Sequence, residues 1–531
     1  MKNLNKYIGV CLLAVALSSC HKDLDLKPTN DVTADVAYKD FQGYTSSFAR
    51  LYGSLTLTST SGPNNSDLGG LDAGTSDFLR LFWNAQELTT DEAACAWLND
   101  PGISGLDYLN FDDSNPMLRG LYTRCVYSAT LVNEFLREST DAKLAERGIS
   151  DTDKEEIAYY RAEARFLRAY NYWVLLDLFG NPPFVTEETP VGKVSPPQIK
   201  RPELFAYVEK ELLEVAGQLK APKQNVYGRV DQAAAWGLLA RLYLNAEVYL
   251  GAGNKKYTEA ITYSEKVLNS NYSLGSNYRE LFYADNDVNN PEFIFYLPYD
   301  GTKTQSKGGT TYLINAAIDA TMNPTSFGVP GGGWAGNRTR DNIATIFGDY
   351  SGETDKRAMF HLNTSVKIED IAVYKQGLAV TKFRNVNKDG KTAPPAAEGF
   401  VASVDFPLIR LGEMNLIYAE ATLRGGAGGT VAKALDYVNK LRVRAYDNNS
   451  GNLANLSLDG ILNERVKELY WEGFRRSDLI RYGKFTGDNY LWPFKGGVLA
   501  GQAVAGYRTL FPLPASDIIA NANLVQNPGY N

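Results

Sequence analysis

Between about residues 150 and 270, apolar side chains recur at the spacing of one face of an α-helix, in four successive segments. The first, 157–178, is closed by Gly180 and Pro182, residue types that end helices. A second segment follows Pro202, a third follows Asp231, whose carboxylate can cap it, and a fourth covers 257–267. Since such helices must bury their apolar faces against one another, the sequence predicts a mostly α-helical fold.

The predicted helices recur in pairs. Small residues at the contacts, tyrosine and leucine at wider positions, and units of roughly 34 residues resemble the tetratricopeptide plan. The stretches AWGLLARLYLNAEVY and YTEAITYSEKVL form one such pair, and further helices are expected at 411–423, 431–445 and 461–482. A helical-repeat scaffold is therefore predicted over 150–270 and 405–485, although such a scaffold does not by itself specify a ligand.

Two irregular stretches, about 52–120 and 285–405, separate these helices. They are rich in glycine, asparagine, threonine, serine and aromatic residues. Loops of this length are uncommon in a compact protein unless they carry function. We therefore expect one domain over 20–531, in which the helices form the scaffold and the long insertions form the ligand-binding face.

Histidine is scarce in a chain that is rich in aromatic rings. Two histidines accompany 33 tyrosines, 23 phenylalanines and 7 tryptophans, and His21 lies in the N-terminal leader region, which leaves His361. A multi-histidine metal site is therefore excluded, and a Ser-His-Asp triad would have to use His361. The net charge of -7 disfavours nucleic acid and anionic membrane surfaces as partners.

Residues 1–19 predict a lipoprotein signal peptide. A basic start precedes the apolar run 8–17, which is too short to span a bilayer comfortably. The run ends in Leu-Ser-Ser-Cys, which resembles a bacterial lipobox and makes Cys20 the expected lipidation site. The alternative is an ordinary secretory signal cut near Ser19. With Cys20 lipidated, residues 20–50 are expected to form a polar tether and the start of the fold.

Four long motifs carry a family resemblance. They are YYRAEARFLRAYNYWVLLDLFGNPPFVTE at 159–187, DFPLIRLGEMNLIYAEATLRGG at 405–426, ILNERVKELYWEGFRRSDLIRYGKF at 461–485 and FPLPASDIIANANLVQNPGYN at 511–531. These motifs resemble the SusD/RagB family of outer-membrane lipoproteins. The resemblance implies a SusD-like fold in a non-catalytic protein, anchored in the outer membrane by its lipid and exposed at the cell surface. It also implies capture of an oligosaccharide or polysaccharide, starch or another glycan, for a SusC-like TonB-dependent transporter. No cofactor is required.

The irregular stretches supply the residue types that bind sugars. Aromatic rings stack on the flat C–H faces of a sugar, and polar side chains hydrogen-bond to its hydroxyl groups. The candidate residues are Arg80, Trp83, Trp97, Asn99 and Asp100 in the first stretch, and Lys307 and Trp334 in the second.

The resemblance narrows this set. Arg80, Trp97 and Trp334 match glycan contacts of the starch-binding members, and a matching asparagine falls on Asn99 or Asp100. Lys307 departs from the pattern, because those members carry an aromatic residue directly before the Gly-Gly pair. Either a nearby ring such as Phe327 replaces it or the preferred glycan is not starch. The structural alternatives are a pair between Arg80 and Asp77 or Glu87, and a core position for Trp334.

Two further features leave alternatives open. Asp285 and Asp287 stand at alternate positions in ADNDVNN, as oxygen ligands do in cation loops, so that either a structural Ca²⁺ site or a polar turn is expected there. Cys95 and Cys125 are the cysteines left after the leader and the lipidation site. Two partly buried thiols are favoured over one disulfide.

Carboxylates raise one rival function. A secreted glycoside hydrolase needs two carboxylates roughly 5–10 Å apart across a sugar cleft. The candidates for that role are Asp72, Asp77, Glu87, Asp91 and Glu92. A protein- or peptide-binding repeat scaffold is the other alternative. In the expected helix over 461–482, by contrast, carboxylates and guanidinium groups alternate at three- and four-residue spacing, which predicts an ion-pair network between helices.

Overall fold

Helices dominate the computed structural model, which describes residues 33–192, 195–394 and 400–530. The predicted mostly α-helical fold is confirmed. The α-helices are α2 (Ala34–Ala37), α3 (Phe41–Thr56), α4 (Phe78–Trp83), α5 (Ile103–Asp107), α6 (Pro116–Glu138), α7 (Asp141–Glu146), α8 (Asp151–Leu178), α9 (Arg201–Ala216), α10 (Gln232–Leu244), α11 (Ala246–Leu250), α12 (Tyr257–Leu268), α13 (Gly309–Ala317), α14 (Asp341–Phe347), α15 (Leu411–Leu423), α16 (Val431–Tyr446), α17 (Leu458–Leu469), α18 (Arg475–Arg481) and α19 (Ala515–Ala520).

Strands are few and short. The sheets of the described residues are antiparallel pairs: β1 (Ala94–Cys95) with β3 (Asn337–Arg338), β2 (Phe293–Leu297) with β6 (Phe406–Arg410), and β4 (Phe360–Leu362) with β5 (Leu378–Val380). Within the described ranges, no helix combines the length and the apolar character needed to cross a bilayer.

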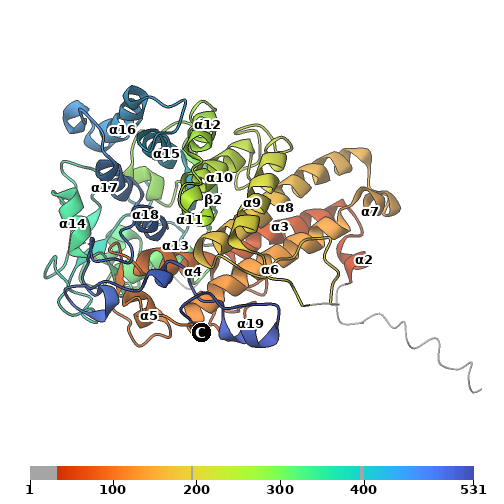
Figure 1. Ribbon diagram of the computed structural model, residues 1–531, viewed down its shortest axis with the longest axis horizontal. Coiled ribbons are helices and arrows are strands. Elements are labelled where there is room, and N and C mark those ends of the chain that lie inside the picture. The colour runs from red at the N-terminus through yellow and green to blue at the C-terminus, as the bar shows by residue number, and fades with distance from the viewer. Residues whose placement is uncertain (1–32, 193–194, 395–399, 531) are drawn as a thin grey trace, which may run out of the picture.

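The scaffold helices stack in chain order. Helix α9 packs on α8, α10 on α9, α12 on α10, α15 on α12, and both α16 and α17 on α15 (Figure 1). As expected, Asp231 caps α10, where its carboxylate accepts a hydrogen bond of 2.8 Å from the backbone N–H of Ala233. Neighbouring helices thus bury a continuous core, as the tetratricopeptide plan predicts.

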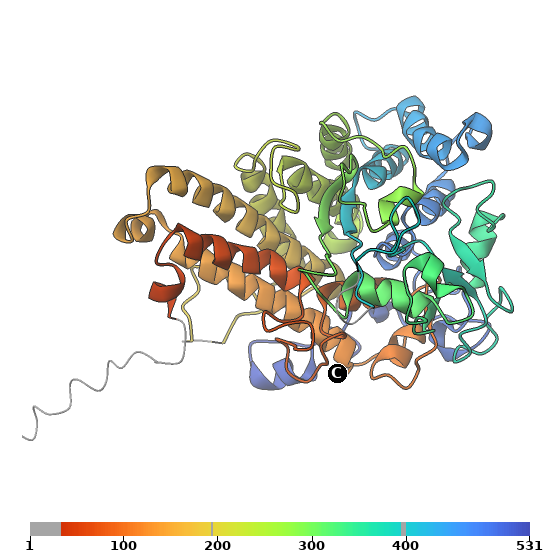
Figure 2. The same ribbon diagram turned by 180° about the vertical axis from the view of Figure 1, so that it is seen from behind.

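Helices α3, α6 and α8 lie side by side and project away from the loop-rich part of the molecule (Figures 1 and 2). The rings of Phe48 and Tyr160 stack between α3 and α8 with centroids 4.1 Å apart. The sequence did not indicate α3, whose first residues fall in the expected tether over 20–50, because its apolar stripe is short and interrupted by serine, threonine and glycine.

The expected helix over 461–482 is two helices, α17 and α18. Trp471 and Gly473 take the left-handed region between them, with φ of 64° and 85°. The carboxylate of Glu92 accepts the N–H of Trp471 at 2.9 Å, and that of Glu87 accepts the N–H of Gly473 at 2.6 Å. Two buried carboxylates from a distant segment therefore bind the backbone groups that a continuous helix would have used itself.

Buried ion pairs join α16, α17 and β6 in a cluster that we call the ion-pair hub. Its members are Glu292, Arg357, Lys382, Arg410, Arg444, Glu464, Glu468 and Glu472. Arg410 lies at the centre, with nitrogens 2.8 Å from Glu292, 2.6 Å from Glu468 and 2.7 Å from Glu472. The predicted ion-pair network is confirmed.

Candidate functional site

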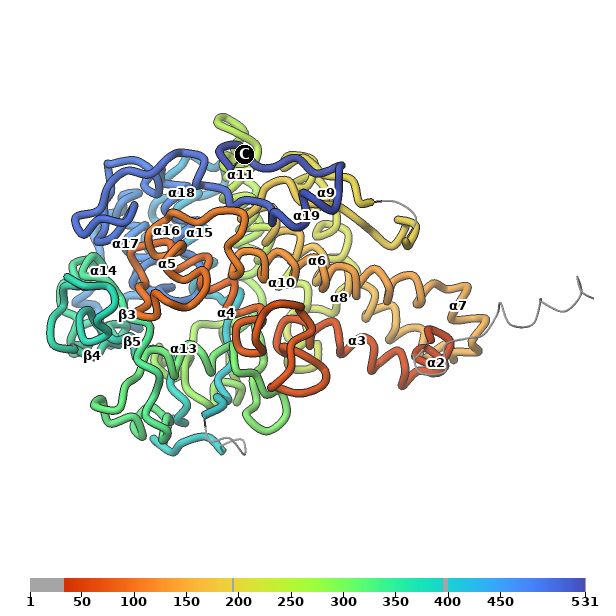
Figure 3. Tube along the Cα trace, turned by 90° about the horizontal axis from the view of Figure 1, so that it is seen from below, coloured from red at the N-terminus to blue at the C-terminus, as the bar shows by residue number. Residues whose placement is uncertain are grey.

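Helix α13 lies among the loops of the two irregular stretches (Figure 3). Contacts to this helix and to its start bring predicted site residues together. The Gly-Gly pair at its start, Gly308 and Gly309, has no room for side chains, since a Cβ added to Gly308 would lie 2.1 Å from the Cβ of Asp77. Asp77 caps α4 by accepting a 3.0 Å hydrogen bond from the backbone N–H of Arg80. The two helices therefore begin in contact, which places Arg80 of α4 beside Tyr312 of α13.

The guanidinium group of Arg80 is held by a ring and not by a carboxylate. The side chain is 8% exposed, and its guanidinium carbon lies 4.3 Å from the centroid of the Tyr312 ring. It makes no ion pair or side-chain hydrogen bond with the described residues, and its buried Nε has no acceptor. The expected alternative of a pair with Asp77 or Glu87 is therefore wrong. A buried arginine with unused donors is suited to the oxygen atoms of a ligand.

Trp97 lies close to the same tyrosine, Tyr312. The two ring centroids are 6.2 Å apart, and the indole is half-buried. Its ring covers Gly336 so closely that a Cβ at that position would lie 2.4 Å from Cζ2. The pairing of β1 with β3 brings these segments together, and the N–H of Ala96 donates to the carbonyl of Gly336 at 2.9 Å.

Asn315, near the end of α13, holds two further rings. Its backbone carbonyl accepts the backbone N–H of Trp334 at 2.7 Å, and its side-chain amide donates to the backbone carbonyl of Phe400 at 3.0 Å. The rings of Trp334 and Phe400 are both half-buried and meet edge to face, with centroids 6.1 Å apart. The ammonium of Lys307 lies 5.7 Å from the centroid of Phe400.

The structure thus brings together four residues predicted from distant segments: Arg80, Trp97, Lys307 and Trp334. Gly74 lies between two of them, since an added Cβ would be 3.3 Å from Nη1 of Arg80 and 3.3 Å from the carbonyl oxygen of Lys307. We call Trp97, Trp334 and Phe400 the ring platform. Sequence reasoning missed Phe400, because only its aromatic character and its place in an irregular stretch pointed to it.

Three further candidates are not part of the ring platform. Asn99 and Asp100 are exposed in the turn after Trp97, where the N–H of Asp100 donates to the Trp97 carbonyl at 2.9 Å. Trp83 was predicted wrongly as a site residue: it is fully buried, and its indole N–H donates to the carbonyl of Trp471 at 3.2 Å. Its position on a short helix packed on both faces explains the burial.

Phe327, expected as the ring that replaces an aromatic residue at Lys307, does not take that place. It is 8% exposed, and the Arg384 guanidinium covers it at 5.1 Å from the ring centroid. Phe400 is the ring beside Lys307 instead. The site therefore has an aromatic residue close to the position at which the sequence places Lys307.

The sequence of this chain is similar to those of known proteins. The family described as "SusD family" matches residues 251–530. The starch-binding protein SusD of Bacteroides thetaiotaomicron is 35% identical over 98% of this chain and 97% of its own length. The chain belongs to the SusD family.

More distant relatives agree with this assignment. The SusD-like protein P2 of Formosa agariphila is 24% identical over 82% of this chain and 85% of its own length. Among solved structures, a SusD homologue from Bacteroides thetaiotaomicron has a TM-score of 0.72 at 19% identity, covering 93% of this chain and 98% of its own. A laminarin-binding SusD-like protein has a TM-score of 0.68 at 22% identity, covering 93% of this chain and all of its own, 100%. These likenesses show a SusD fold.

Three of the five carboxylates considered for a hydrolase serve structural contacts in this SusD fold. Asp91 pairs with Arg475 through two contacts of 2.7 and 2.8 Å, and Glu87 and Glu92 accept backbone N–H groups between α17 and α18. Burial raises the pKa of Glu92 to about 7. These three groups are buried beneath the surface, whereas a glycosidase needs its two carboxylates on either side of an open cleft.

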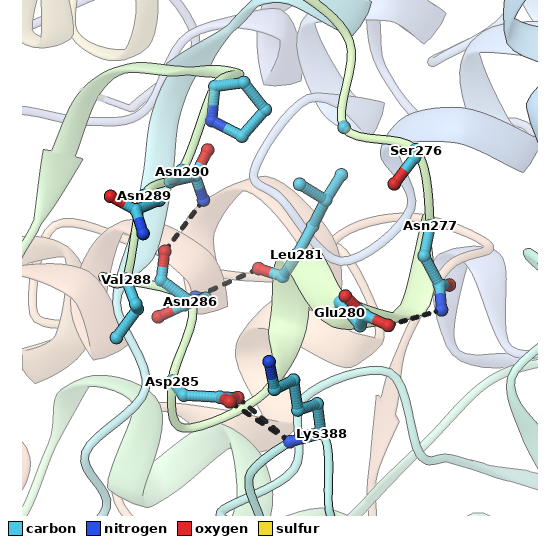
Figure 4. A pocket seen from close by; sticks show the side chains of 12 residues that line it. Ser276, Asn277, Glu280, Leu281, Asp285, Asn286, Val288, Asn289, Asn290 and Lys388 are labelled. Carbon is cyan, nitrogen blue, oxygen red and sulfur yellow. Dashed lines mark hydrogen bonds between the residues drawn. The ribbon is translucent and has the colours of Figure 1, made fainter.

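The segment that carries Asp285 and Asp287 borders a cavity of about 280 Å³ (Figure 4). The carboxylate of Asp285 accepts the backbone N–H of Lys388 at 3.1 Å. Within the described ranges, no group of three or more histidine, cysteine, aspartate and glutamate side chains is placed to hold a metal ion. Calcium at Asp285 and Asp287 stays a prediction.

The two remaining cysteines are free thiols. Cys95 and Cys125 are both buried and form no disulfide. Burial raises the pKa of Cys95 to about 12, so that it stays a neutral thiol at physiological pH. The favoured expectation of two thiols is confirmed.

Proposed function

We propose that this protein captures a starch-type glucan on the ring platform, without catalysing a reaction on it. The observation that carries the proposal is the buried Arg80, which has donors without an acceptor, beside Trp97. Support for the glucan comes from the 35% identity to a starch-binding protein over nearly the whole chain. Where the starch-binding members have an aromatic residue, this chain has Lys307. Phe400, which lies beside Lys307, supplies a ring at that place.

The platform binds by stacking and selects by hydrogen bonding. Trp97, Trp334 and Phe400 come from three segments, so their half-buried rings face successive sugar units instead of one deep pocket. Arg80 donates hydrogen bonds to hydroxyl oxygens between them, and Lys307 adds a cationic donor at the Phe400 end. None of these groups has to transfer a proton, because capture leaves every glycosidic bond intact.

We further propose that a lipid on Cys20 anchors the protein to the outer membrane, and that the captured glycan passes to a SusC-like TonB-dependent transporter. Cys20 lies outside the described residues, so support comes from the lipobox-like sequence and from family membership. Replacing Cys20 with alanine should move the full-length protein from the membrane fraction to the soluble fraction. A Cys20→Ala protein that stays in the membrane would rule out this anchor.

The glycan proposal is tested by affinity electrophoresis in native gels that contain amylopectin, laminarin, levan or xylan. Wild-type protein should be retarded most in amylopectin. The double variant Trp97→Ala/Trp334→Ala should lose most of this retardation, since each stacked ring contributes about 0.5–1.5 kcal/mol. Trp236→Ala, which removes a half-buried indole of α10 outside the platform, is the matched control. Equal mobility of the double variant and the wild type would contradict the site assignment.

A further inference from the structure

A second cavity, of about 190 Å³, shares no residue with the ring platform. It is bounded by the segment between α9 and α10, by β2, and by Tyr272 and Asn290; the lining residues used below are Lys223, Tyr227, Asp231, Tyr272 and Tyr296. We propose that this cavity is a second sugar subsite, which binds a single pyranose unit of the captured glucan. The inference rests on the proposed function and adds a second point of attachment.

Tyr227 offers an exposed ring whose orientation is fixed. Its side chain is 48% exposed, yet its hydroxyl donates a hydrogen bond to the buried side chain of Asp405. The ring also packs on Tyr296, with centroids 4.8 Å apart at 42°. A surface tyrosine held at both its hydroxyl and one face loses little rotational freedom when a sugar stacks on it, which favours binding.

Asp231 organises the opposite wall. Its Oδ2 accepts a 2.8 Å hydrogen bond from the hydroxyl of Tyr272 and a 2.7 Å hydrogen bond from the backbone N–H of Lys223. Lys223 takes the left-handed region, with φ of 62°, which is unusual for a residue other than glycine. This conformation places its ammonium 5.0 Å from the centroid of Tyr272, and in the described chain the ammonium forms no ion pair.

The segment between α9 and α10 is tied to β2 and to α3. The N–H of Gly228 donates to the hydroxyl of Tyr296 at 2.7 Å, and the N–H of Val230 donates to the hydroxyl of Tyr52 at 3.0 Å. The backbone of the segment is therefore held by two tyrosine hydroxyls and the carboxylate of Asp231, although it connects two helices on the surface. Such a loop presents its side chains in a fixed geometry.

The combination fits a neutral sugar. Two tyrosine rings offer apolar faces, and an ammonium without an ion pair donates to vicinal hydroxyls. Arg229, the other cation of the lining, is already paired with Glu156 and Glu163, so the cavity has no concentrated positive charge for a phosphate or sulfate. The volume is below the roughly 300–1,000 Å³ of drug-sized sites, which restricts the ligand to about one sugar ring.

Two subsites on one protein bind a polymer more tightly than either does alone, because the second contact is intramolecular once the first has formed. An oligosaccharide too short to reach both subsites gains nothing. The second subsite is therefore expected to matter for polysaccharide and not for a short oligosaccharide.

The experiment compares amylopectin and maltoheptaose on the full chain carrying Tyr227→Ala or Lys223→Met. Each variant should weaken retention in amylopectin gels about 3- to 10-fold, while the calorimetric Kd for maltoheptaose at the ring platform changes less than about twofold. Tyr227→Phe keeps the stacking ring and removes the hydrogen bond to Asp405, so it should lose less retention than Tyr227→Ala if stacking is the main cause. Retention as weak in Tyr227→Phe as in Tyr227→Ala would overturn the stacking role.

Tyr159→Ala is the matched control, because Tyr159 is an exposed tyrosine with Lys220 4.8 Å above its ring, outside the cavity. Wild-type retention in both Tyr227→Ala and Lys223→Met would overturn the second subsite. That result is distinct from a failure of the ring platform, which would show as unchanged retention and unchanged maltoheptaose affinity in Trp97→Ala/Trp334→Ala. Density for maltotriose beside Tyr227 in crystals of that double variant would support the second subsite directly.

Discussion

Arg410 in the ion-pair hub and Arg80 beside the ring platform are similarly buried, at 1% and 8% exposed, but have opposite surroundings. Arg410 contacts three glutamates, whereas Arg80 lies on a tyrosine ring and has no carboxylate partner among the described residues. A buried charge is costly unless it is paired, so the first arrangement holds the fold together. The second keeps hydrogen-bond donors available, which is what a binding site requires.

The different roles of Arg410 and Arg80 are tested most directly by removing each guanidinium group in turn. Arg410→Met leaves Glu292, Glu468 and Glu472 without their shared cation, and should destabilise the protein by about 3–5 kcal/mol. Arg80→Met removes no ion pair and should change stability by less than about 1 kcal/mol, while amylopectin retention falls. Urea unfolding followed by tryptophan fluorescence and circular dichroism checks both variants. Comparable losses of stability would show that Arg80 is a structural residue.

Gly336→Ala tests whether the position of a platform ring matters when every ring is still present. The new Cβ would lie 2.4 Å from Cζ2 of Trp97, so the indole must move away from its place beside Tyr312. We expect about a fivefold weaker Kd for maltoheptaose by calorimetry, which corresponds to a loss of about 1 kcal/mol. Gly331→Ala is the control, since nothing lies within 4 Å of its added Cβ. Equal affinities in the two variants would mean that Trp97 does not contact the sugar.

Phe400→Ala tests whether the Phe400 ring takes the place of the aromatic residue that the starch-binding members have where this chain has Lys307. If it does, maltoheptaose affinity should fall about two- to fivefold, and Phe400→Tyr should restore it, because the ring is all that stacking requires. The backbone carbonyl that accepts from Asn315 is retained in both variants. Unchanged affinity in Phe400→Ala would limit the platform to Trp97 and Trp334.

The scaffold could be predicted from sequence much better than the platform. Helical periodicity and end signals such as Gly180 are local, so most scaffold helices were found close to their true bounds. The break at Trp471 was missed, because it depends on Glu87 and Glu92 from a segment almost 400 residues away in sequence. Phe400 was missed for the same reason: nothing near it in the chain indicates Asn315 as its partner. Trp83 shows the reverse error, a ring in a loop-rich stretch that tertiary packing buries.

The acidic groups of the two regions should also make stability depend on pH in different ways. This effect is the smallest of those predicted. In the hub, arginines hold the pKa of Glu468 below its usual value despite its burial. Near the loops, burial raises the pKa of Asp107 to about 6 and that of Asp405 to about 7. In the unfolded chain these aspartates have a pKa near about 4, so between pH 5 and 8 the folded state binds more protons.

The free energy of unfolding should therefore fall as pH rises from 5 to 8, whereas the hub contribution of Glu468 is lost only below about pH 4. Asp405→Asn replaces a protonated acid with a neutral side chain of the same shape, and should flatten this dependence in urea titrations at pH 5, 6, 7 and 8. Glu146→Gln, at an exposed position on α7, should leave it unchanged. A slope that is the same in Asp405→Asn and in the wild type would show that Asp405 ionises normally in the folded protein. The two regions would then differ only in their arginines.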